Sequence, residues 1–160
     1  MALGPLEGAR VMDLYAGSGA LAIEALSRGA AWADLVDFDR SARETAFRNL
    51  EELGLAERAR IWPLRLPAGL ARIAGALARA DVVFADPPYG GADARALLAG
   101  LGRPGVIPAG ARLVLEAHAK DGIPEAAGVL GHRRDRRYGE TLVHVYTAGG
   151  ATSQAEGGKS

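Results

Sequence analysis

Residues 11–20 read Val-Met-Asp-Leu-Tyr-Ala-Gly-Ser-Gly-Ala, an apolar run with one acid that breaks into a glycine turn. The apolar part predicts a buried strand, and the residues from Gly19 onward predict the start of a helix. Gly17 and Gly19 permit a sharp turn and leave peptide N–H groups open to a ligand, while the helix start adds unpaired donors. The stretch therefore predicts a nucleotide-binding corner of an α/β fold, with an ordinary tight strand-to-helix turn as the alternative.

The residues around these glycines indicate what kind of ligand the corner would take. A dinucleotide-binding turn follows the pattern G-x-G-x-x-G, but Gly19 is followed by Ala-Leu-Ala at 20–22. The missing third glycine argues against a pyrophosphate. Asp13, placed in the strand just before the turn, suits a cationic or amino-bearing ligand better than a phosphate.

Composition restricts the class of protein further. The chain has 160 residues, of which 49% are hydrophobic, so it can bury the core of one domain. We expect a single domain over residues 1–147 and a disordered tail over 148–160. The formal net charge is zero and cysteine is absent. Attraction for nucleic acid must therefore come from a local patch, and disulfides, thiolate zinc sites and cysteine nucleophiles are excluded.

The N-terminus does not resemble a signal peptide. Every apolar run is interrupted by Gly, Arg or Asp before it reaches membrane-spanning length. We therefore expect a cytoplasmic protein without a membrane partner, and we expect it to be a monomer.

Strands and helices alternate along most of the chain. We expect strands at 9–14, 33–38, 59–64, 81–85 and 111–116, helices at 19–28, 39–53, 66–80 and 92–101, and a closing antiparallel pair at 128–138 and 141–146. This alternation predicts a mostly parallel sheet covered on both faces, with ligands at the carboxyl ends of the strands. The distinctive segments at Gly17, Asp37 and Asp86 should therefore share one rim of the sheet.

The end of the second expected strand carries two acids on either side of an aromatic residue. Asp37 lies about twenty residues after the glycine turn, the position from which a carboxylate accepts hydrogen bonds from the ribose hydroxyls of a nucleoside. Asp39 precedes a helical run and is expected to be its N-cap. Phe38 lies between them. It either lies against an adenine ring or belongs to the core.

Asp86-Pro87-Pro88-Tyr89 follows the fourth expected strand, and two consecutive prolines fix the backbone there. The exocyclic amine of a nucleobase is a poor nucleophile because its lone pair is conjugated with the ring. A site that holds its N–H groups with acceptors frees the lone pair to face an electrophile. Asp86 and a carbonyl of the diproline are two such acceptors, and Tyr89 offers a face for base stacking. The alternative is a rigid turn into the next helix.

Four stretches together are more specific than any one of them: residues 13–21 (DLYAGSGAL), 24–30 (EALSRGA), 86–89 (DPPY) and 138–141 (YGET). They resemble the class I S-adenosylmethionine-dependent methyltransferases that modify exocyclic amines, which carry a glycine-rich first motif and a (Asp/Asn)-Pro-Pro-(Tyr/Phe) fourth motif. Within that class the sequence is similar to the bacterial small-subunit ribosomal RNA guanine-N2 methyltransferases. The resemblance extends over most of the chain, from Gly8 to Tyr146.

The resemblance implies a Rossmann-like α/β fold with a seven-stranded, mostly parallel sheet, an antiparallel C-terminal hairpin and helices on both faces. It implies S-adenosyl-L-methionine as the cofactor and N2 of a guanine in small-subunit (16S) rRNA, free or in the assembling small ribosomal subunit, as the methyl acceptor. Direct displacement needs no metal, and we expect none. By position, Asp13, Ala16, Gly17 and Gly19 would hold the amino acid end of the cofactor, Asp37 its ribose and Phe38 its adenine, while Asp86, Pro87, Pro88 and Tyr89 would hold the target base.

The sequence departs from the family pattern in two places. Family members usually carry an N-terminal extension before the first strand, whereas the sequence given enters its first strand at Ala9. After the third strand they commonly have Asp or Asn followed by a small residue near the adenine amine, where this chain has Arg-Leu-Pro at 65–67.

Other functions stay open at the level of sequence. The motif at 86–89 also presents acceptors to adenine N6 in DNA or RNA, or to a protein glutamine amide. From a different class, the chain could be a cofactor-binding module that has no activity without a partner.

One dense basic run, His-Arg-Arg-Asp-Arg-Arg at 132–137, falls in the closing hairpin. Strand alternation aims half of these charges at one face, which predicts an RNA phosphate contact by Arg133, Arg134, Arg136 and Arg137. The alternative is an edge strand protected by charge, which needs no partner.

Overall fold

The structure, a computed structural model, describes residues 5–149, without the side chains of His132 and Arg133. Its strands are β1 (Arg10–Leu14), β2 (Trp32–Val36), β3 (Ala59–Trp62), β4 (Val82–Ala85), β5 (Arg112–His118), β6 (Leu130–Tyr138) and β7 (Thr141–Ala148). Its helices are α1 (Ala20–Ser27), α2 (Arg40–Glu52), α3 (Ala74–Leu77) and α4 (Ala92–Leu101), with 3₁₀ turns at Ala56–Arg58 and Ala68–Ile73.

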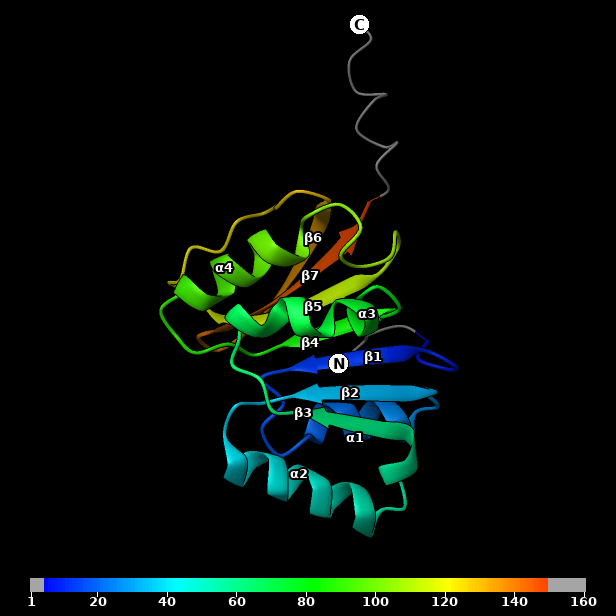
Figure 1. Cartoon of the computed structure of the whole chain (residues 1–160). Coiled ribbons are helices and arrows are strands. Elements are labelled where there is room, and N and C mark those ends of the chain that lie inside the picture. Colours follow the sequence, from blue (N-terminus) through cyan, green and yellow to red (C-terminus); the bar gives the residue numbers. More distant parts are fainter. Residues whose placement is uncertain (1–4, 150–160) are drawn as a thin grey trace, which may run out of the picture.

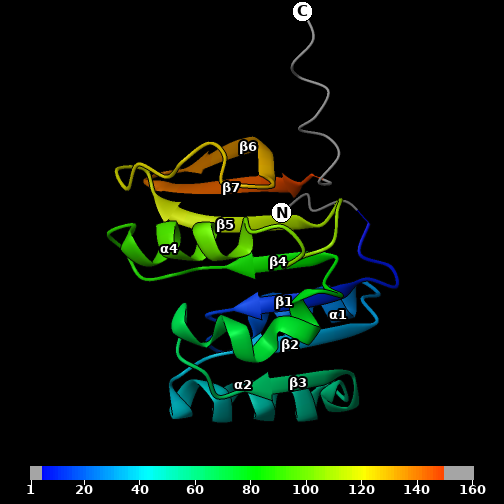
Figure 2. The ribbon, with the colours of Figure 1, turned by 45° about the horizontal axis from the view of Figure 1, so that its top comes forward.

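All strands join one seven-stranded sheet of order β3-β2-β1-β4-β5-β7-β6. The strands from β3 to β5 pair in parallel, and β7 pairs antiparallel with both β5 and β6. Figure 2 shows this order, with the β6–β7 hairpin at one edge of the sheet and β3 at the other. The expected Rossmann-like class I methyltransferase architecture, with its antiparallel C-terminal hairpin, is confirmed.

The core lies in two layers, one on each face of the sheet. Because side chains alternate along a strand, Met12 and Leu14 of β1 pack on the layer with Leu97 of α4, whereas Val11 packs on the layer with Ala22 of α1. Helices α1 and α2 thus cover one face, and α3 and α4 cover the other (Figure 1). No helix within residues 5–149 is long and apolar enough to cross a membrane.

The expected helix over 66–80 is wrong in its first half. A 3₁₀ turn occupies Ala68–Ile73, and only Ala74–Leu77 is α-helical. Pro67 lacks a donor, and the glycines at 69 and 75 disfavour helix, so the apolar content of this segment does not produce a regular helix.

Several strand ends also differ from expectation. Strand β2 ends at Val36 and β5 at His118, where the expected ends were 38 and 116. Strand β3 ends at Trp62 because Pro63 cannot donate to a ladder. Strand β7 continues to the buried residue Ala148, one residue past the expected domain end, and residues 150–160 of the expected tail lie outside the described residues.

Candidate active site

The glycine turn between β1 and α1 begins at a strained residue. Tyr15 has φ 59°, a left-handed conformation that a tyrosine rarely adopts, and Gly17 and Gly19 follow with φ 57° and 82°. A Cβ at Gly19 would come within 3.0 Å of Leu35 Cδ2, whereas one at Gly17 would meet nothing within 4 Å. Gly19 therefore serves the packing of α1 on β2, and Gly17 leaves open space at the surface of the turn.

Asp13 lies under this turn and is almost fully buried. Its Oδ2 accepts a hydrogen bond of 3.3 Å from the backbone N–H of Ala22, in the first turn of α1. Burial raises the pKa of Asp13 to about 7, and the charges of Asp37 and Asp86 add to the rise against the effect of that hydrogen bond. A carboxylate that is costly to ionise in the free protein is well matched to a cationic group on a ligand.

Asp37 joins the end of β2 to the glycine turn. Its Oδ2 accepts from the N–H of Gly17 at 2.8 Å, and its Oδ1 accepts from the N–H of Asp39 at 2.9 Å. Asp39 is the N-cap of α2, as expected, and accepts from the N–H of Ser41 at 3.2 Å. Arg43 braces the same loop by donating to the carbonyl of Phe38 at 2.6 Å. The two acids thus differ in role, because Asp39 starts a helix and Asp37 is held at the rim.

Phe38 is 56% exposed, so its interpretation as a core residue is wrong. The guanidinium carbon of Arg65 lies over its ring, 3.8 Å from the centroid. Arg65 belongs to the segment after β3 that departs from the family pattern. One face of the aromatic ring expected to meet adenine is therefore covered by an arginine of this chain.

Asp86 to Tyr89 leave the end of β4, next to the end of β1. Burial raises the pKa of Asp86. Tyr89 is 81% exposed and meets the ring of His118 edge-on, with 6.3 Å between centroids. The sheet thus brings the glycine turn, Asp37 and the diproline motif to one rim, as the strand-end pattern predicted.

Glu116 and His118, both on β5, are residues at this rim that the sequence motifs missed. Ala85 of β4 pairs with Leu115 of β5, so Asp86 and Glu116 follow side by side. Desolvation raises the pKa of Glu116, and the charge of Asp86 raises it further. His118 Nε2 lies 3.3 Å from Glu140 Oε2 in the β6–β7 turn. The signal for Glu116 was available, since it ends the fifth expected strand.

Tyr15 is a second missed residue. Its hydroxyl is buried and has no hydrogen-bond partner within the described part of the chain. Burial raises the pKa of Tyr15 to about 12, and Asp93 at the start of α4 contributes. The strained backbone and the unsatisfied hydroxyl lie in the segment that carries the glycine turn.

The arginines of β6 lie on the edge strand opposite β3. Arg134, Arg136 and Arg137 are exposed, Arg137 Nε donates to the carbonyl of Gly139 at 2.8 Å, and the side chain of Arg133 lies outside the described residues. Arg134, Arg136 and Arg137 are therefore available to a partner, whereas Asp135 pairs with the buried His144. Across the described residues, no His, Cys, Asp and Glu side chains gather in a group of three or more that could hold a metal ion.

Comparisons with known proteins bear on the family and the fold of this chain. The model of the family described as conserved hypothetical protein 95 matches residues 2–147. A Bacillus subtilis (strain 168) protein named "Putative rRNA methyltransferase YlbH" is 34% identical over 90% of this chain and 79% of its own length. Ribosomal RNA small subunit methyltransferase D of Escherichia coli (strain K12) is 28% identical over 86% of this chain and 68% of its own. A solved structure of a conserved hypothetical protein from Streptococcus pyogenes has a TM-score of 0.80 at 31% identity, over 89% of this chain and 87% of that one.

The fold, the rim and these relatives define a class I S-adenosylmethionine-dependent methyltransferase. The residues present fit that cofactor, because a buried acid with a raised pKa, an open glycine and a rim carboxylate meet at the end of β1. The chain belongs to the family of conserved hypothetical protein 95.

Proposed function

We propose that this chain transfers a methyl group from S-adenosyl-L-methionine to the N2 amine of a guanine in small-subunit rRNA. The observation that carries the base specificity is the pair of neighbouring carboxylates, Asp86 and Glu116, at the ends of β4 and β5. The names of the relatives support rRNA as the substrate.

Two adjacent acceptors match guanine better than other planar amines. The Watson–Crick edge of guanine presents the N1–H donor directly beside the N2 amine, so two donors are adjacent along that edge. Adenine places an acceptor, N1, beside its amine, and a glutamine amide places its carbonyl oxygen there. A carboxylate at Glu116 attracts guanine N1–H, whereas it repels the lone pair of adenine N1. The pair at 86 and 116 thus argues for guanine N2 over the adenine and glutamine alternatives.

In this proposal the cofactor supplies an electrophilic methyl group on a sulfonium sulfur. The carboxylate of Asp86 and the fixed carbonyl of Pro87 hold the two N–H groups of N2, so that the nitrogen lone pair faces the methyl carbon. The carboxylate of Asp86 would also accept the proton that the nitrogen loses once it has taken the methyl group that the bound cofactor would supply. Neither a metal nor a covalent enzyme intermediate is needed, and we propose a monomeric cytoplasmic enzyme.

The other rim residues position the two reactants. Asp13 meets the ammonium group of the cofactor, Gly17 lets its amino acid end approach the backbone, and Asp37 accepts from its ribose. The exposed ring of Tyr89 stacks on the target base. Each role uses a property of the residue in the free protein. Asp13 is buried, Gly17 has open space where a Cβ would lie, and Tyr89 is exposed.

The test is transfer of labelled methyl from S-adenosyl-L-methionine to unmodified small ribosomal subunits, naked rRNA and duplex DNA in parallel, followed by nucleoside analysis. The expected product is N2-methylguanosine. Label on adenine, or no label despite cofactor binding, contradicts the proposal.

Glu116→Gln tests separately whether the neighbouring carboxylates of Asp86 and Glu116 determine the base specificity. The variant keeps the volume of the side chain but offers a donor as well as an acceptor, so the preference for guanine over adenine should shrink by about tenfold or more. Glu125→Gln, at an exposed position outside the rim, is the matched control. An unchanged preference in Glu116→Gln assigns the specificity to other groups.

A further inference from the structure

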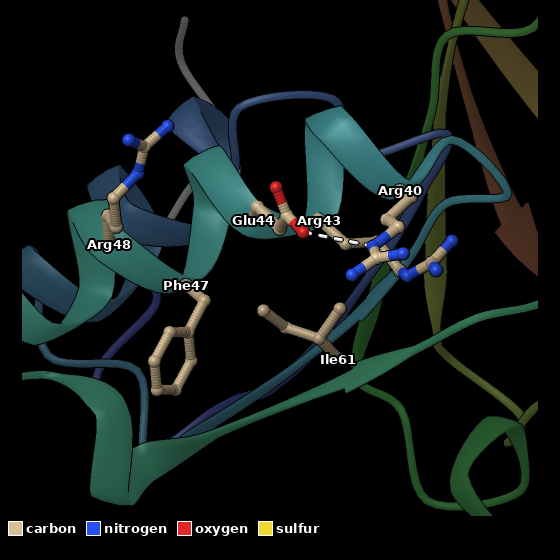
Figure 3. Close-up of a pocket in the computed structure, with 6 residues that line it drawn as sticks. All are labelled: Arg40, Arg43, Glu44, Phe47, Arg48 and Ile61. Atoms are coloured by element: carbon tan, nitrogen blue, oxygen red, sulfur yellow. Dashed lines mark hydrogen bonds and ion pairs between the residues drawn. The ribbon is translucent and has the colours of Figure 1, made fainter.

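A hollow of about 530 Å³ lies between α2 and the edge strand β3, and its lining contains none of the residues predicted to hold the cofactor or the target base. Figure 3 shows its walls, with side chains of α2 above and Ile61 of β3 below. We call it the α2–β3 groove, and it is lined by Arg40, Arg43, Glu44, Phe47, Arg48 and Ile61.

The charge of the groove is positive on a chain with no net charge. Three arginines face one acid, and Arg40 Nε pairs with Glu44 Oε1 at 3.0 Å on the exposed face of α2. Arg48 makes a long contact of 3.4 Å to Thr45 Oγ1. A guanidinium has five N–H donors, so these contacts leave donors for further acceptors. A groove of this kind favours an anion with several oxygens, such as a phosphate.

The lining also includes an exposed aromatic ring, while Figure 3 shows Arg40 and Arg43 at one end of the groove and Arg48 directed away from Ile61. Phe47 is 49% exposed, and its ring lies beneath α2 beside Ile61 (Figure 3). Arginines interleaved with an exposed aromatic residue are the combination that single-stranded nucleic acids bind, because phosphates pair with the cations and an unstacked base covers the ring. An acidic peptide could use the same groups, and we take RNA as the occupant because the relatives are named as rRNA methyltransferases.

The groove begins where the cofactor loop ends. Arg40 follows directly after the N-cap Asp39, so the groove starts at the rim and runs down along α2. From β3 to β4, which carries Asp86, there are three strand spacings across β2 and β1, roughly 14 Å. A stacked strand rises about 3.4 Å per nucleotide, so the groove lies roughly four nucleotides from a base held at Asp86.

We propose that the α2–β3 groove binds single-stranded RNA roughly four nucleotides from the target nucleotide, with its arginines on phosphates and Phe47 against an unstacked base. The inference rests on the proposed function only in taking RNA as the substrate. It does not depend on which base is methylated.

The test is the affinity for small-subunit rRNA as a function of salt, without methyl transfer. Arg40→Gln/Arg48→Gln removes two exposed cations and leaves Arg43, which holds the carbonyl of Phe38. The slope of log K against log salt should fall by about 1.4, because each phosphate contact with a single strand contributes about 0.7. Phe47→Ala should weaken binding about fivefold or more at constant slope. The matched control is Arg72→Gln/Arg79→Gln, an exposed pair before β4 with the same change in charge.

Thermal unfolding and cofactor affinity should both match the wild type in these variants. These two measurements distinguish a loss of RNA binding from a folding defect. In turnover, the groove variants should raise KM for RNA and leave kcat unchanged. An unchanged slope in Arg40→Gln/Arg48→Gln, or an equal fall in the control pair, overturns the proposal. If the label is found on adenine while the groove variants still change the RNA affinity as expected, the guanine assignment is contradicted and the groove proposal is supported.

Discussion

The carboxyl rim of the sheet and the α2–β3 groove adjoin each other at Asp39, yet they hold their charged side chains in opposite ways. At the rim, Asp13 is buried, and the half-buried Asp37 accepts two backbone hydrogen bonds. In the groove, Arg40 and Arg48 are exposed.

The difference follows from the cost of burying charge. A buried acid is expensive to ionise alone, so it selects a small ligand that brings the missing cation or donor into a fixed position. Exposed arginines cost little and hold an extended anion through many weak contacts. In our proposals the rim is the site of the reaction and the groove binds the substrate. The zero net charge of the chain does not reveal this division.

Asp86→Ala should give the largest effect on the rim. Removing the acceptor that holds the reacting amine should lower kcat about 10²- to 10³-fold, the range for losing one preorganised transition-state contact. The affinity for S-adenosyl-L-methionine should stay within about twofold, because in our proposal Asp86 holds the base rather than the cofactor. Single-turnover methyl transfer and calorimetry measure the two quantities. Glu52→Ala, at the exposed end of α2, is the control and should leave both unchanged.

Asp13→Asn should separate cofactor binding from stability. Asn can still accept from the N–H of Ala22 but cannot meet a cation, so affinity for the cofactor should fall roughly tenfold or more. In the wild type the affinity should also decline as pH falls below about 7, where Asp13 takes up a proton, and this decline should be missing in the variant. Calorimetric titrations between pH 6 and pH 8, flanking that value, provide the comparison.

The pH dependence of stability in the protein without cofactor should be opposite to that of the cofactor affinity. Because the pKa of Asp13 rises from 3.8 in the unfolded chain to about 7 in the fold, the unfolded state releases its proton first. The free energy of unfolding therefore falls as pH rises from 3.8 to about 7, by at most roughly 4 kcal/mol, and levels off above that. Asp13→Asn lacks this loss and should be the more stable protein at neutral pH. Parallel urea-unfolding curves for the two proteins at every pH would falsify this assignment.

Gly17→Ala and Gly19→Ala form a matched pair within the glycine turn. Both residues have positive φ, so each alanine costs about 1 kcal/mol in backbone strain. Only at Gly19 does the new methyl also press on Leu35, so its variant should lose about 2 kcal/mol or more of stability. Gly17→Ala should instead lose mainly cofactor affinity, because its methyl stands in the open approach. Equal stability losses with intact cofactor binding in Gly17→Ala would show that the turn serves packing alone.

The sequence predicted most of the rim because its residues lie in short, recognisable sequence patterns. A strand that ends in glycines, an acid before a helix and a diproline each leave a short signal, and parallel strands bring such ends together. Asp39 as N-cap and the shared rim follow from these signals alone.

The groove and the contacts of Phe38 left no such signal. Ile61 meets residues of α2 only through the order of the sheet, and Arg65 reaches Phe38 from a loop 27 positions further along the chain. The expected helix at 66–80 failed although Leu66, Ile73 and Leu77 are buried at helical spacing, because Pro67 and the glycines at 69 and 75 disfavour a regular helix between them. The strand-end rule could also have identified Glu116, because it ends the fifth expected strand, but Glu116 belongs to no recognised motif.

The smallest expected effect concerns the edge of the sheet opposite the groove. Arg136 pairs with Val143, and Val143 pairs with Glu116, so Arg136 lies level with Glu116 on the same face, two strands away. Arg137, the next residue, points to the other face. Arg136→Gln should therefore raise KM for RNA about fivefold, roughly 1 kcal/mol, whereas Arg137→Gln should leave KM unchanged. Equal effects of the two variants would mean that β6 attracts RNA by overall charge. No effect of either, together with aggregation, would assign these arginines to the protection of an open strand edge.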